Sequence, residues 1–326
     1  MTHIGIIGFG RMGQLMAELF HQIERVRVAG MAEIAPANIR VAEAYGIPVY
    51  TDYRDLLDQP LDGVYVATPN ALHKENVLAA AERGIPILCE KPIALTLADA
   101  DEMVRAVETT GVPTVVNFKL RFSEALERLR AYLTSGELGR LLTCWLRTFR
   151  GYGLYGAGVR HRAVVRPDLS GGWVVHRSIH ATDWLVFIGG PVASVVSRTF
   201  RSAPDAPSPE GMFGLLNFAD GAVAHLADSV VGYRERAAGI VGTLGTATYD
   251  KGGLVRFHAE MGTPESGEDV LTPARDHGSE RAVARHFVAV VRGEEEPRVS
   301  LQEGRYALKV VLALLESAET GAVVKL

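Results

Sequence analysis

The chain has 326 residues, of which 48% are hydrophobic and 22% charged, a composition that excludes a disordered, collagen-like or coiled-coil protein. Its 34 basic and 38 acidic residues give a net charge of −4, so it offers no general attraction to nucleic acid or to an anionic membrane. The two cysteines form no CxxC pattern, and no apolar run of about 18 residues predicts a membrane span. With no signal-like leader, we expect a cytoplasmic protein of about two domains and a small-molecule partner.

The first predicted domain, residues 1–120, alternates short β-branched runs with amphipathic helical stretches. This is the pattern of parallel βαβ units with helices on both faces of a sheet. A helix over 71–83 is expected to end before Gly84, because glycine is common just after a helix. We predict a doubly wound parallel Rossmann sheet with strands at residues 3–7, 26–31, 48–50, 63–67, 86–89 and 114–117.

The second predicted domain, residues 121–326, is an α+β domain on a mostly antiparallel open sheet. Its predicted strands are residues 141–149, 193–199, 213–218, 222–227, 239–241 and 246–249, and its helices are 123–133, 279–291 and 301–318. The stretch Ser202–Glu210 is expected to be an exposed loop, and the closing helix is expected to pack back on the first domain. One sheet face has to be covered, which predicts a homodimer or homotetramer formed through it.

Residues 8–13, Gly-Phe-Gly-Arg-Met-Gly, follow the first predicted strand and open the first helix. This is the context that a dinucleotide fingerprint requires. Gly8 permits a tight turn, Gly10 lets the backbone approach a pyrophosphate, and Gly13 allows close packing of helix and strand. The N–H groups at the helix start would hold the anion.

A carboxylate, Glu33, ends the second predicted strand about 20 residues beyond Gly13. It can accept hydrogen bonds from the ribose hydroxyls of adenosine and would repel a 2′-phosphate. No arginine directly follows it, so NAD is favoured. NADP stays open as the alternative, because Arg40 lies two helical turns on and Arg11 lies in the loop itself.

Four further stretches form a recognisable series: Ala-Thr-Pro-Asn-Ala-Leu-His at 67–73, Cys-Glu-Lys-Pro at 89–92, Gly-Gly-Trp at 171–173 and His-Ala-Thr-Asp at 180–183. Over essentially its whole length the chain resembles the Gfo/Idh/MocA family of NAD(P)-dependent oxidoreductases, which act largely on sugars, inositols and sugar nucleotides. The resemblance implies that Lys91 contacts both nicotinamide and substrate, that His180 is an acid/base, and that the Lys91–Pro92 peptide is cis.

The sequence departs from this family pattern at one place. Many dehydrogenases of the family carry an Asp four residues before the catalytic His and a Gly two before it, where this chain has His176 and Ser178. The local sequence resembles a subgroup with His-Lys-Ser there. His176 is therefore a further catalytic candidate.

A metal site is the alternative for the same histidines. On a regular α-helix, His176, His180 and Asp183 would share one face at metal-ligand spacing. Against a metal, Arg177 stands where the metalloprotease pattern has Glu. We therefore predict no metal, with Asp183 orienting an imidazole or accepting a structural hydrogen bond.

The stretch from Arg147 to Arg166 holds five arginines and no acidic residue. Two interpretations stay open. Arg160 and Arg162 could bind a carboxylate or phosphate while Tyr152 packs on a sugar ring, or the arginines could face solvent or a neighbouring subunit.

We predict an oxidoreductase that transfers a hydride between NAD and a hydroxyl-bearing carbon of a sugar, inositol or sugar derivative. The alternatives are an NAD-bound enzyme that uses transient oxidation for net elimination, hydrolysis or isomerisation, and a non-catalytic dinucleotide-sensing regulatory protein. The predicted catalytic residues are Lys91, His180 and His176. The predicted cofactor-binding residues are Gly8, Phe9, Gly10, Arg11, Met12, Gly13, Glu33, Thr68, Pro69, Asn70, His73, Glu90 and Lys91. The predicted substrate-binding residues are Lys91, Arg121, Tyr152, Arg160, Arg162, Trp173, His176 and His180.

Overall fold

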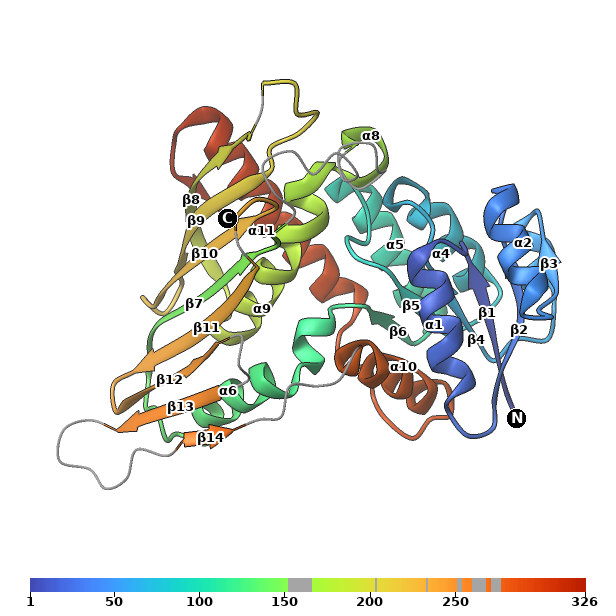
Figure 1. Cartoon of the computed structure of the whole chain (residues 1–326), viewed down its shortest axis with the longest axis horizontal. Helices are drawn as coiled ribbons and strands as arrows, with labels where there is room; N and C mark the ends of the chain where they lie inside the picture. The colour runs from blue at the N-terminus through green and yellow to red at the C-terminus, as the bar shows by residue number, and fades with distance from the viewer. Residues whose placement is uncertain (152–165, 203, 233, 251–253, 260–267, 271–276) are drawn as a thin grey trace. The chain divides into compact units, whose positions relative to one another are not determined.

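A computed structural model describes the chain except for residues 152–165, 203, 233, 251–253, 260–267 and 271–276 and the side chains of 254–259 and 268–270 (Figure 1). The chain divides into two compact units. The first unit comprises Met1–Lys119 and Glu280–Leu308, and the second comprises Leu120–Ser279 and Lys309–Leu326. Of the helices described, none is long and apolar enough to span a membrane.

Six parallel strands form the sheet of the first unit, in the order β3-β2-β1-β4-β5-β6. This is the Rossmann order, in which the direction of winding reverses between β1 and β4. The predicted doubly wound fold is confirmed, and each predicted strand differs by at most a residue or two at its ends. The strands are β1 (Thr2–Ile7), β2 (Val26–Ala32), β3 (Val49–Tyr50), β4 (Gly63–Val66), β5 (Ile87–Cys89) and β6 (Thr114–Val116).

Helices cover both faces of this sheet. Phe20 of α1 lies 6.4 Å, between ring centroids, from both Tyr65 of β4 and Phe287 of α10, which places α1 and α10 on one face. Helix α3 packs on β1, β2 and β3, and also contacts α4, which packs against α5. As predicted, Gly84 follows α4 with a positive φ of +69°. The helices are α1 (Arg11–His21), α2 (Pro36–Ala44), α3 (Tyr53–Leu57), η1 (Asn70–Leu72), α4 (His73–Glu82), α5 (Leu97–Thr110), α10 (Gly278–Val291) and the start of α11 (Leu301–Thr320).

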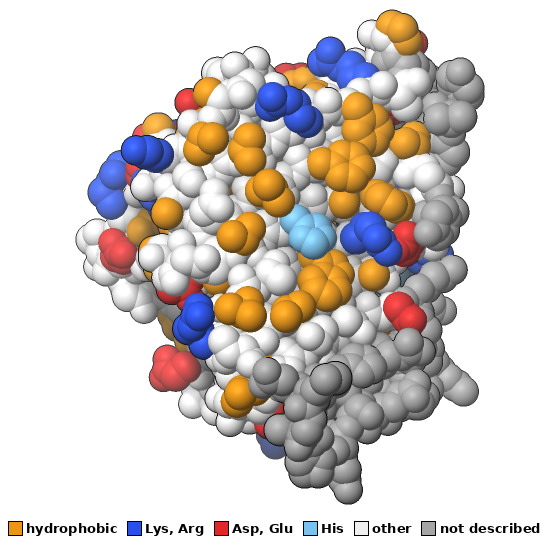
Figure 2. All heavy atoms as spheres, turned by 90° about the vertical axis from the view of Figure 1, so that its left-hand side faces the viewer, with side chains coloured by type: hydrophobic (Ala, Val, Ile, Leu, Met, Phe, Trp, Pro, Cys, Tyr) orange, Lys and Arg blue, Asp and Glu red, His pale blue; other side chains and the backbone are white. Residues whose placement is uncertain are grey.

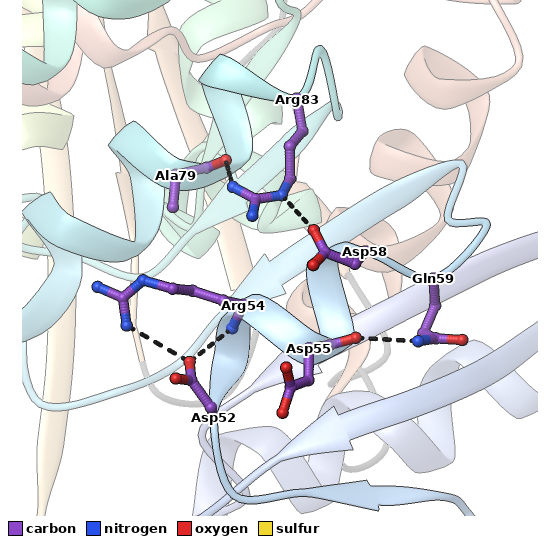
Figure 3. A network of polar contacts seen from close by, with 7 residues as sticks. All are labelled: Asp52, Arg54, Asp55, Asp58, Gln59, Ala79 and Arg83. Atoms are coloured by element: carbon purple, nitrogen blue, oxygen red, sulfur yellow. Dashed lines mark hydrogen bonds and ion pairs between the residues drawn. The ribbon is translucent and has the colours of Figure 1, made fainter.

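A small polar network fastens α3 to the end of α4 (Figure 3). Asp52 caps α3 by accepting from the Arg54 backbone N–H at 2.9 Å. From α4, Arg83 donates to Asp58 at 2.9 Å and to the Ala79 carbonyl at 3.1 Å. Ion pairs this exposed contribute about 0–1 kcal/mol each, so the network adjusts the packing of the two helices without holding the fold together.

Nine described strands form the sheet of the second unit, in the order β14-β13-β12-β11-β7-β10-β9-β8-β15. Strands β7 and β10 pair in parallel and the other neighbours are antiparallel, so the predicted mostly antiparallel sheet is confirmed. Strands β13, β14 and β15 were not predicted. The strands are β7 (Leu141–Phe149), β8 (Val192–Phe200), β9 (Gly211–Phe218), β10 (Val223–Ser229), β11 (Glu235–Gly242), β12 (Gly245–Tyr249), β13 (Leu254–Ala259), β14 (Glu268–Val270) and β15 (Val324–Lys325).

One face of this second sheet is covered by helices. Helix α6 packs on β11, β12 and β13, whereas α9 packs on β7 and β10. The end of α11 is bonded to β8, because the Ser197 N–H donates to Ser317 Oγ at 3.0 Å and the Ser197 hydroxyl donates to the Leu314 carbonyl. The helical elements of this unit are η2 (Lys119–Phe122), α6 (Glu124–Thr134), α8 (Pro167–Ser170), η4 (Val174–Ser178), α9 (Ile179–Gly189) and the end of α11.

The opposite face of the second sheet, which we call the open face, carries exposed apolar side chains. Phe213 and Leu215 of β9 are 51% and 46% exposed. Trp145 of β7 and His225 of β10 stack in parallel, with ring centroids 6.0 Å apart. Figure 2 shows hydrophobic side chains spread over this side of the molecule.

The loop at Ser202–Glu210, predicted to be exposed, is exposed only in part. Pro204, Asp205 and Pro207 are exposed, whereas Ala206, Ser208 and Glu210 are buried. The Glu210 carboxylate accepts from the Ser202 N–H at 2.8 Å, and the Ser208 hydroxyl accepts from the Trp173 N–H at 3.1 Å. Ser208 and Glu210 can be buried because their side chains have hydrogen-bond partners.

Candidate active site

The glycine loop, residues 8–13, lies at the carboxyl end of β1, beside the end of β4, where Ile7 pairs with Val66. Gly8 has a φ of +90°, and a Cβ there would lie 2.8 Å from the Ala67 carbonyl group. A Cβ on Gly13 would lie 2.2 Å from the Gly8 oxygen, whereas a Cβ on Gly10 would meet nothing within 4 Å. The first and third glycines therefore allow close packing, and the second faces open space.

The start of α1 is arranged for an anion. Its N-cap residue, Gly10, makes no side-chain cap bond, and the first turn contains no acidic residue. Arg11 is exposed and Met12 is half-buried at this end of the helix. Open space in front of uncapped N–H groups fits the pyrophosphate of a dinucleotide.

Glu33, just after β2, is tied to the glycine loop. Its carboxylate accepts from the N–H groups of Phe9 (2.8 Å), Ile34 (2.8 Å) and Ala35 (2.9 Å) and from the Asn38 amide (3.0 Å). Partial burial raises the pKa of Glu33, but these hydrogen bonds outweigh it and the net shift is downward. The carboxylate is thus ionised at neutral pH. The Phe9 side chain is fully buried, so only the backbone of Phe9 is available to a ligand at the glycine loop.

The loop after β4 contains the predicted residues Thr68, Pro69 and Asn70. Pro69 is exposed, Asn70 is buried, and the Thr68 hydroxyl donates to the Asn76 side-chain oxygen at 2.9 Å. This loop and the glycine loop occupy the switch point of the sheet, the position at which open α/β sheets bind ligands.

His73, predicted to bind the cofactor, is fully buried. Its Nδ1 lies 2.9 Å from the Pro92 carbonyl oxygen and its Nε2 lies 3.0 Å from the Thr68 carbonyl oxygen. Burial is the largest cause of a lowered pKa for this imidazole. The two ring nitrogens therefore lie against backbone carbonyl groups of two neighbouring loops. Through the Pro92 carbonyl, His73 supports the Lys91–Pro92 turn.

Lys91 follows β5 and is 5% exposed, and its peptide bond to Pro92 is cis, as the resemblance implies. Glu90 beside it accepts from the Tyr65 hydroxyl (2.6 Å), the Asn117 amide (2.5 Å) and the Lys91 N–H (3.2 Å). Burial and the Glu90 charge raise the pKa of Tyr65 well above its ordinary value, so the phenol remains a donor. Glu90 thereby fixes the backbone from which Lys91 extends.

In the second unit, the predicted histidines lie on a helix that begins with a π-helical turn. Residues 174–178 form the π-helix η4, and α9 continues from Ile179. The expectation of a regular α-helical face for His176, His180 and Asp183 is therefore wrong at His176, because the π-turn is wider. His180 is buried and His176 is half-buried. Single π-turns occur often at functional sites. We call residues 174–183 the histidine segment.

Asp183 is fully buried and forms an ion pair with Arg121 of η2. The Arg121 Nη2 lies 2.6 Å from Asp183 Oδ1, and its Nε lies 3.0 Å from Oδ2. The same guanidinium lies 4.4 Å over the Phe187 ring of α9. Arg121, predicted to bind substrate, thus anchors α9. Within the described part of the chain, no group of three or more His, Cys, Asp or Glu side chains could hold a metal ion.

Trp173 is 1% exposed and packs against Val230 just after β10. The backbone N–H of Trp173 donates to the Ser208 hydroxyl. The remaining substrate candidates, Tyr152, Arg160 and Arg162, lie outside the described residues.

Three polar residues in or near these sites were not predicted. Asn38 binds Glu33, Asn117 binds Glu90, and Asp228 is buried on β10, a strand against which η4 packs. Asn38 follows Glu33 by five residues, near the start of a helix, and that spacing could have indicated it. The other two depend on strand pairing, which the local sequence does not report.

Comparison with known proteins agrees with both units. Residues 2–118 match the model of an oxidoreductase family with an NAD-binding Rossmann fold, and residues 130–326 match the C-terminal alpha/beta domain of the same family. Together with the glycine loop, these matches define an NAD(P)-dependent oxidoreductase that acts on CH–OH groups. The chain belongs to the Gfo/Idh/MocA family.

The chain is similar to several curated relatives. It is 30% identical to a 1,5-anhydro-D-fructose reductase of Ensifer adhaerens over 83% of this chain and 82% of the relative. It is 30% identical to D-xylose 1-dehydrogenase (NADP(+)) 2 of Haloferax volcanii over 99% and 98%. Among solved structures, levoglucosan dehydrogenase in complex with NADH superposes with a TM-score of 0.88 at 21% identity, over 99% of this chain and 98% of that one, which supports the fold.

Proposed function

We propose that the protein transfers a hydride between NAD and a hydroxyl-bearing carbon of a sugar, an inositol or a related derivative. The observation that carries this proposal is the Glu90–Lys91 turn at the carboxyl end of β5, in the same sheet as the glycine loop. A cation held there, in a Rossmann unit, suits a substrate oxygen next to a nicotinamide. The names of the relatives, which include an inositol 2-dehydrogenase of Streptomyces avermitilis that is 29% identical over 98% of this chain and 92% of the relative, support the substrate class.

The residues of the first unit fit a dinucleotide. The N–H groups at the start of α1 would hold the pyrophosphate, and Glu33 would accept from the adenosine ribose. When bound, the nicotinamide supplies the hydride-accepting chemistry. The protein contributes alignment and charge, with the Lys91 ammonium polarising the substrate oxygen.

We assign the proton to His180. Imidazole is the side chain suited to exchange a proton near neutral pH, so His180 can take the proton of a substrate hydroxyl and return it in the reverse reaction. His176 supplies a second imidazole, which lacks the fixed negative charge that an Asp would have.

The preferred cofactor is NAD, with NADP as the alternative. Glu33 is ionised and held by four hydrogen bonds, so a 2′-phosphate brought beside it would meet a like charge. One relative is named for NADP(+), so the test must include both cofactors.

We further propose that the open face binds a second copy of this chain, giving a homodimer or homotetramer in the cytoplasm. Exposed Phe213 and Leu215 and the Trp145–His225 stack form an apolar surface suited to a self-complementary contact. Light scattering of the wild type and of Leu215→Glu tests this. A monomeric wild type would contradict it.

The function is tested by a panel of sugars, inositols and sugar acids with NAD⁺ and NADP⁺, with absorbance reporting reduced nicotinamide and chromatography reporting product. Net reduction of the cofactor with an oxidised sugar product is expected. Product formation without net reduction would instead indicate transient oxidation in an elimination, hydrolysis or isomerisation. Cofactor binding without turnover across the panel would indicate a dinucleotide sensor.

A further inference from the structure

Three polar side chains from neighbouring strands of the first sheet meet at one buried point. Tyr65 lies on β4, Glu90 follows β5 and Asn117 follows β6, and these strands are neighbours in the order β4-β5-β6. Tyr65 is 0%, Glu90 7% and Asn117 2% exposed. Because the strands are parallel, their carboxyl ends bring together residues that lie 25 and 27 positions apart in the sequence.

One oxygen of the Glu90 carboxylate accepts two hydrogen bonds. The Tyr65 hydroxyl lies 2.6 Å and the Asn117 amide nitrogen 2.5 Å from Glu90 Oε1. The other oxygen, Oε2, accepts from the Lys91 N–H at 3.2 Å. A carboxylate that is held by donors from two strands has one fixed orientation, so its second oxygen keeps its direction toward the Lys91 N–H. The three bonds link β4 and β6 to the backbone of Lys91.

The turn that carries Lys91 is held on both sides. The Glu90 N–H donates to the Val66 carbonyl at 2.9 Å, and the Glu90 carboxylate binds the Lys91 N–H. On the other side, His73 Nδ1 lies 2.9 Å from the Pro92 carbonyl oxygen. A lysine side chain has a flexible four-carbon stem, so a fixed backbone and 5% exposure together limit the positions that the Lys91 ammonium can reach.

The polar groups around Glu90 are not explained by packing alone. Among the described residues, the Asn117 side-chain oxygen is buried and has no hydrogen-bond partner. A buried acceptor without a partner costs free energy, and an apolar side chain at this position would avoid that cost. Burial and the Glu90 charge raise the pKa of Tyr65 well above its ordinary value, so its hydroxyl remains a donor. What the amide and the hydroxyl share is donation to the Glu90 carboxylate.

We propose that Tyr65 and Asn117 are positioning residues for Lys91, acting through Glu90. They orient the carboxylate that fixes the Lys91 turn, and they thereby set where the ammonium lies. The polarising role of Lys91 rests on the proposed function, whereas the hold on its side chain does not. No chemical step is assigned to Tyr65 or Asn117.

Two bonds from a phenol to a carboxylate within the first unit provide a matched test in the full chain. Tyr65→Phe removes the bond to Glu90, and Tyr45→Phe removes an exposed bond of 2.8 Å to Glu18 of α1. We expect Tyr65→Phe to lower kcat by about tenfold, with the dissociation constant for NAD⁺ changed less than about twofold. Tyr45→Phe should keep both values within about twofold of the wild type. Equal losses of kcat in the two variants would overturn the proposal.

A double-variant cycle tests whether the two residues act through the same carboxylate. Asn117→Ala should also lower kcat by about tenfold, and the variant that combines it with Tyr65→Phe should lose less than the product of the two single losses. In a Glu90→Ala background, Tyr65→Phe should change kcat by less than about twofold. Losses that multiply in the combined variant, or a full tenfold effect of Tyr65→Phe without Glu90, would show that Tyr65 acts by another route.

Carbon-13 NMR of lysine-labelled protein gives a readout that does not need turnover. The ε-carbon signal of Lys91, identified by its absence from Lys91→Ala, should shift in Tyr65→Phe and in Asn117→Ala but not in Tyr45→Phe. An unchanged Lys91 signal in the first two variants would contradict the positioning role. An inactive wild type whose Lys91 signal still responds to Tyr65→Phe would contradict only the proposed function.

Discussion

The predicted cofactor site of the first unit and the histidine segment of the second unit are held by different kinds of contact. In the first unit, the predicted residues follow the carboxyl ends of four parallel strands, β1, β2, β4 and β5, and some of their contacts come from neighbouring backbone groups, as at Glu33. In the second unit, His176 lies on the π-turn and His180 on α9, and the buried pair of Asp183 with Arg121, 62 residues away in sequence, joins α9 to η2. Local motifs thus specify the glycine loop and part of the Glu33 contacts, whereas Glu90 and the histidine segment depend on tertiary packing.

The largest expected effect separates binding from chemistry within the first unit. Lys91→Ala should lower kcat by roughly 10²-fold or more, because the polarising cation is lost, while NAD⁺ still binds through the glycine loop. Steady-state kinetics and an NAD⁺ titration measure the two effects. Lys74→Ala, at an exposed ion pair with Asp99 on the same unit, is the control and should leave both unchanged. A Lys91→Ala variant with near-normal turnover would contradict the role of Lys91.

The second prediction concerns the histidine segment. His180→Ala should lower kcat by roughly 10²-fold and remove the acidic limb of the rate profile, because the proton acceptor is lost. His176→Asp provides the companion: a fixed negative charge stabilises a protonated His180, so its acidic limb should move to higher pH. If the limb persists in His180→Ala, another group takes the proton.

The third prediction distinguishes packing from ligand approach in the glycine loop. Gly13→Ala places a Cβ 2.2 Å from the Gly8 oxygen and should destabilise the protein by about 1–3 kcal/mol. Gly10→Ala meets nothing within 4 Å and should melt like the wild type while its NAD⁺ affinity falls. Calorimetric melting and an NAD⁺ titration measure these effects. Equal NAD⁺ affinity in Gly10→Ala and the wild type would show that the pyrophosphate binds elsewhere.

The smallest effect is expected at Glu33. Glu33→Ser should weaken or invert the preference for NAD⁺ over NADP⁺ by about tenfold, because the like charge is removed. The folded-state pKa of Glu33 is lowered from its reference of 4.5, so its ionised form stabilises the fold above that pH, and this contribution is lost as pH falls through the lower folded value. The preference should therefore stay constant from neutral pH down to pH 4.5. A wild type that binds NADP⁺ more tightly would contradict this assignment.

What could be predicted from the sequence also differs between the two units. The strands of the first sheet and the glycine loop were predictable because alternation, β-branched runs and Gly spacing are local signals. The burial of Ser208 and the position of Asp228 were not, because Ser208 accepts from the Trp173 backbone N–H 35 residues away and Asp228 is placed by the pairing of β10 with β7. The π-turn at 174–178 was not predicted either. Strand β15, two residues long, is too short to carry a periodic pattern.

Hydride transfer is tested most directly by following the hydrogen atom on the hydroxyl-bearing carbon of the substrate. The best substrate from the panel, deuterated at the hydroxyl-bearing carbon, is incubated with NAD⁺ and the purified protein, and mass spectrometry locates the deuterium. Hydride transfer predicts one deuterium in the reduced nicotinamide for each molecule of oxidised product. Product formed while the nicotinamide carries no deuterium would contradict hydride transfer as the reaction of this protein.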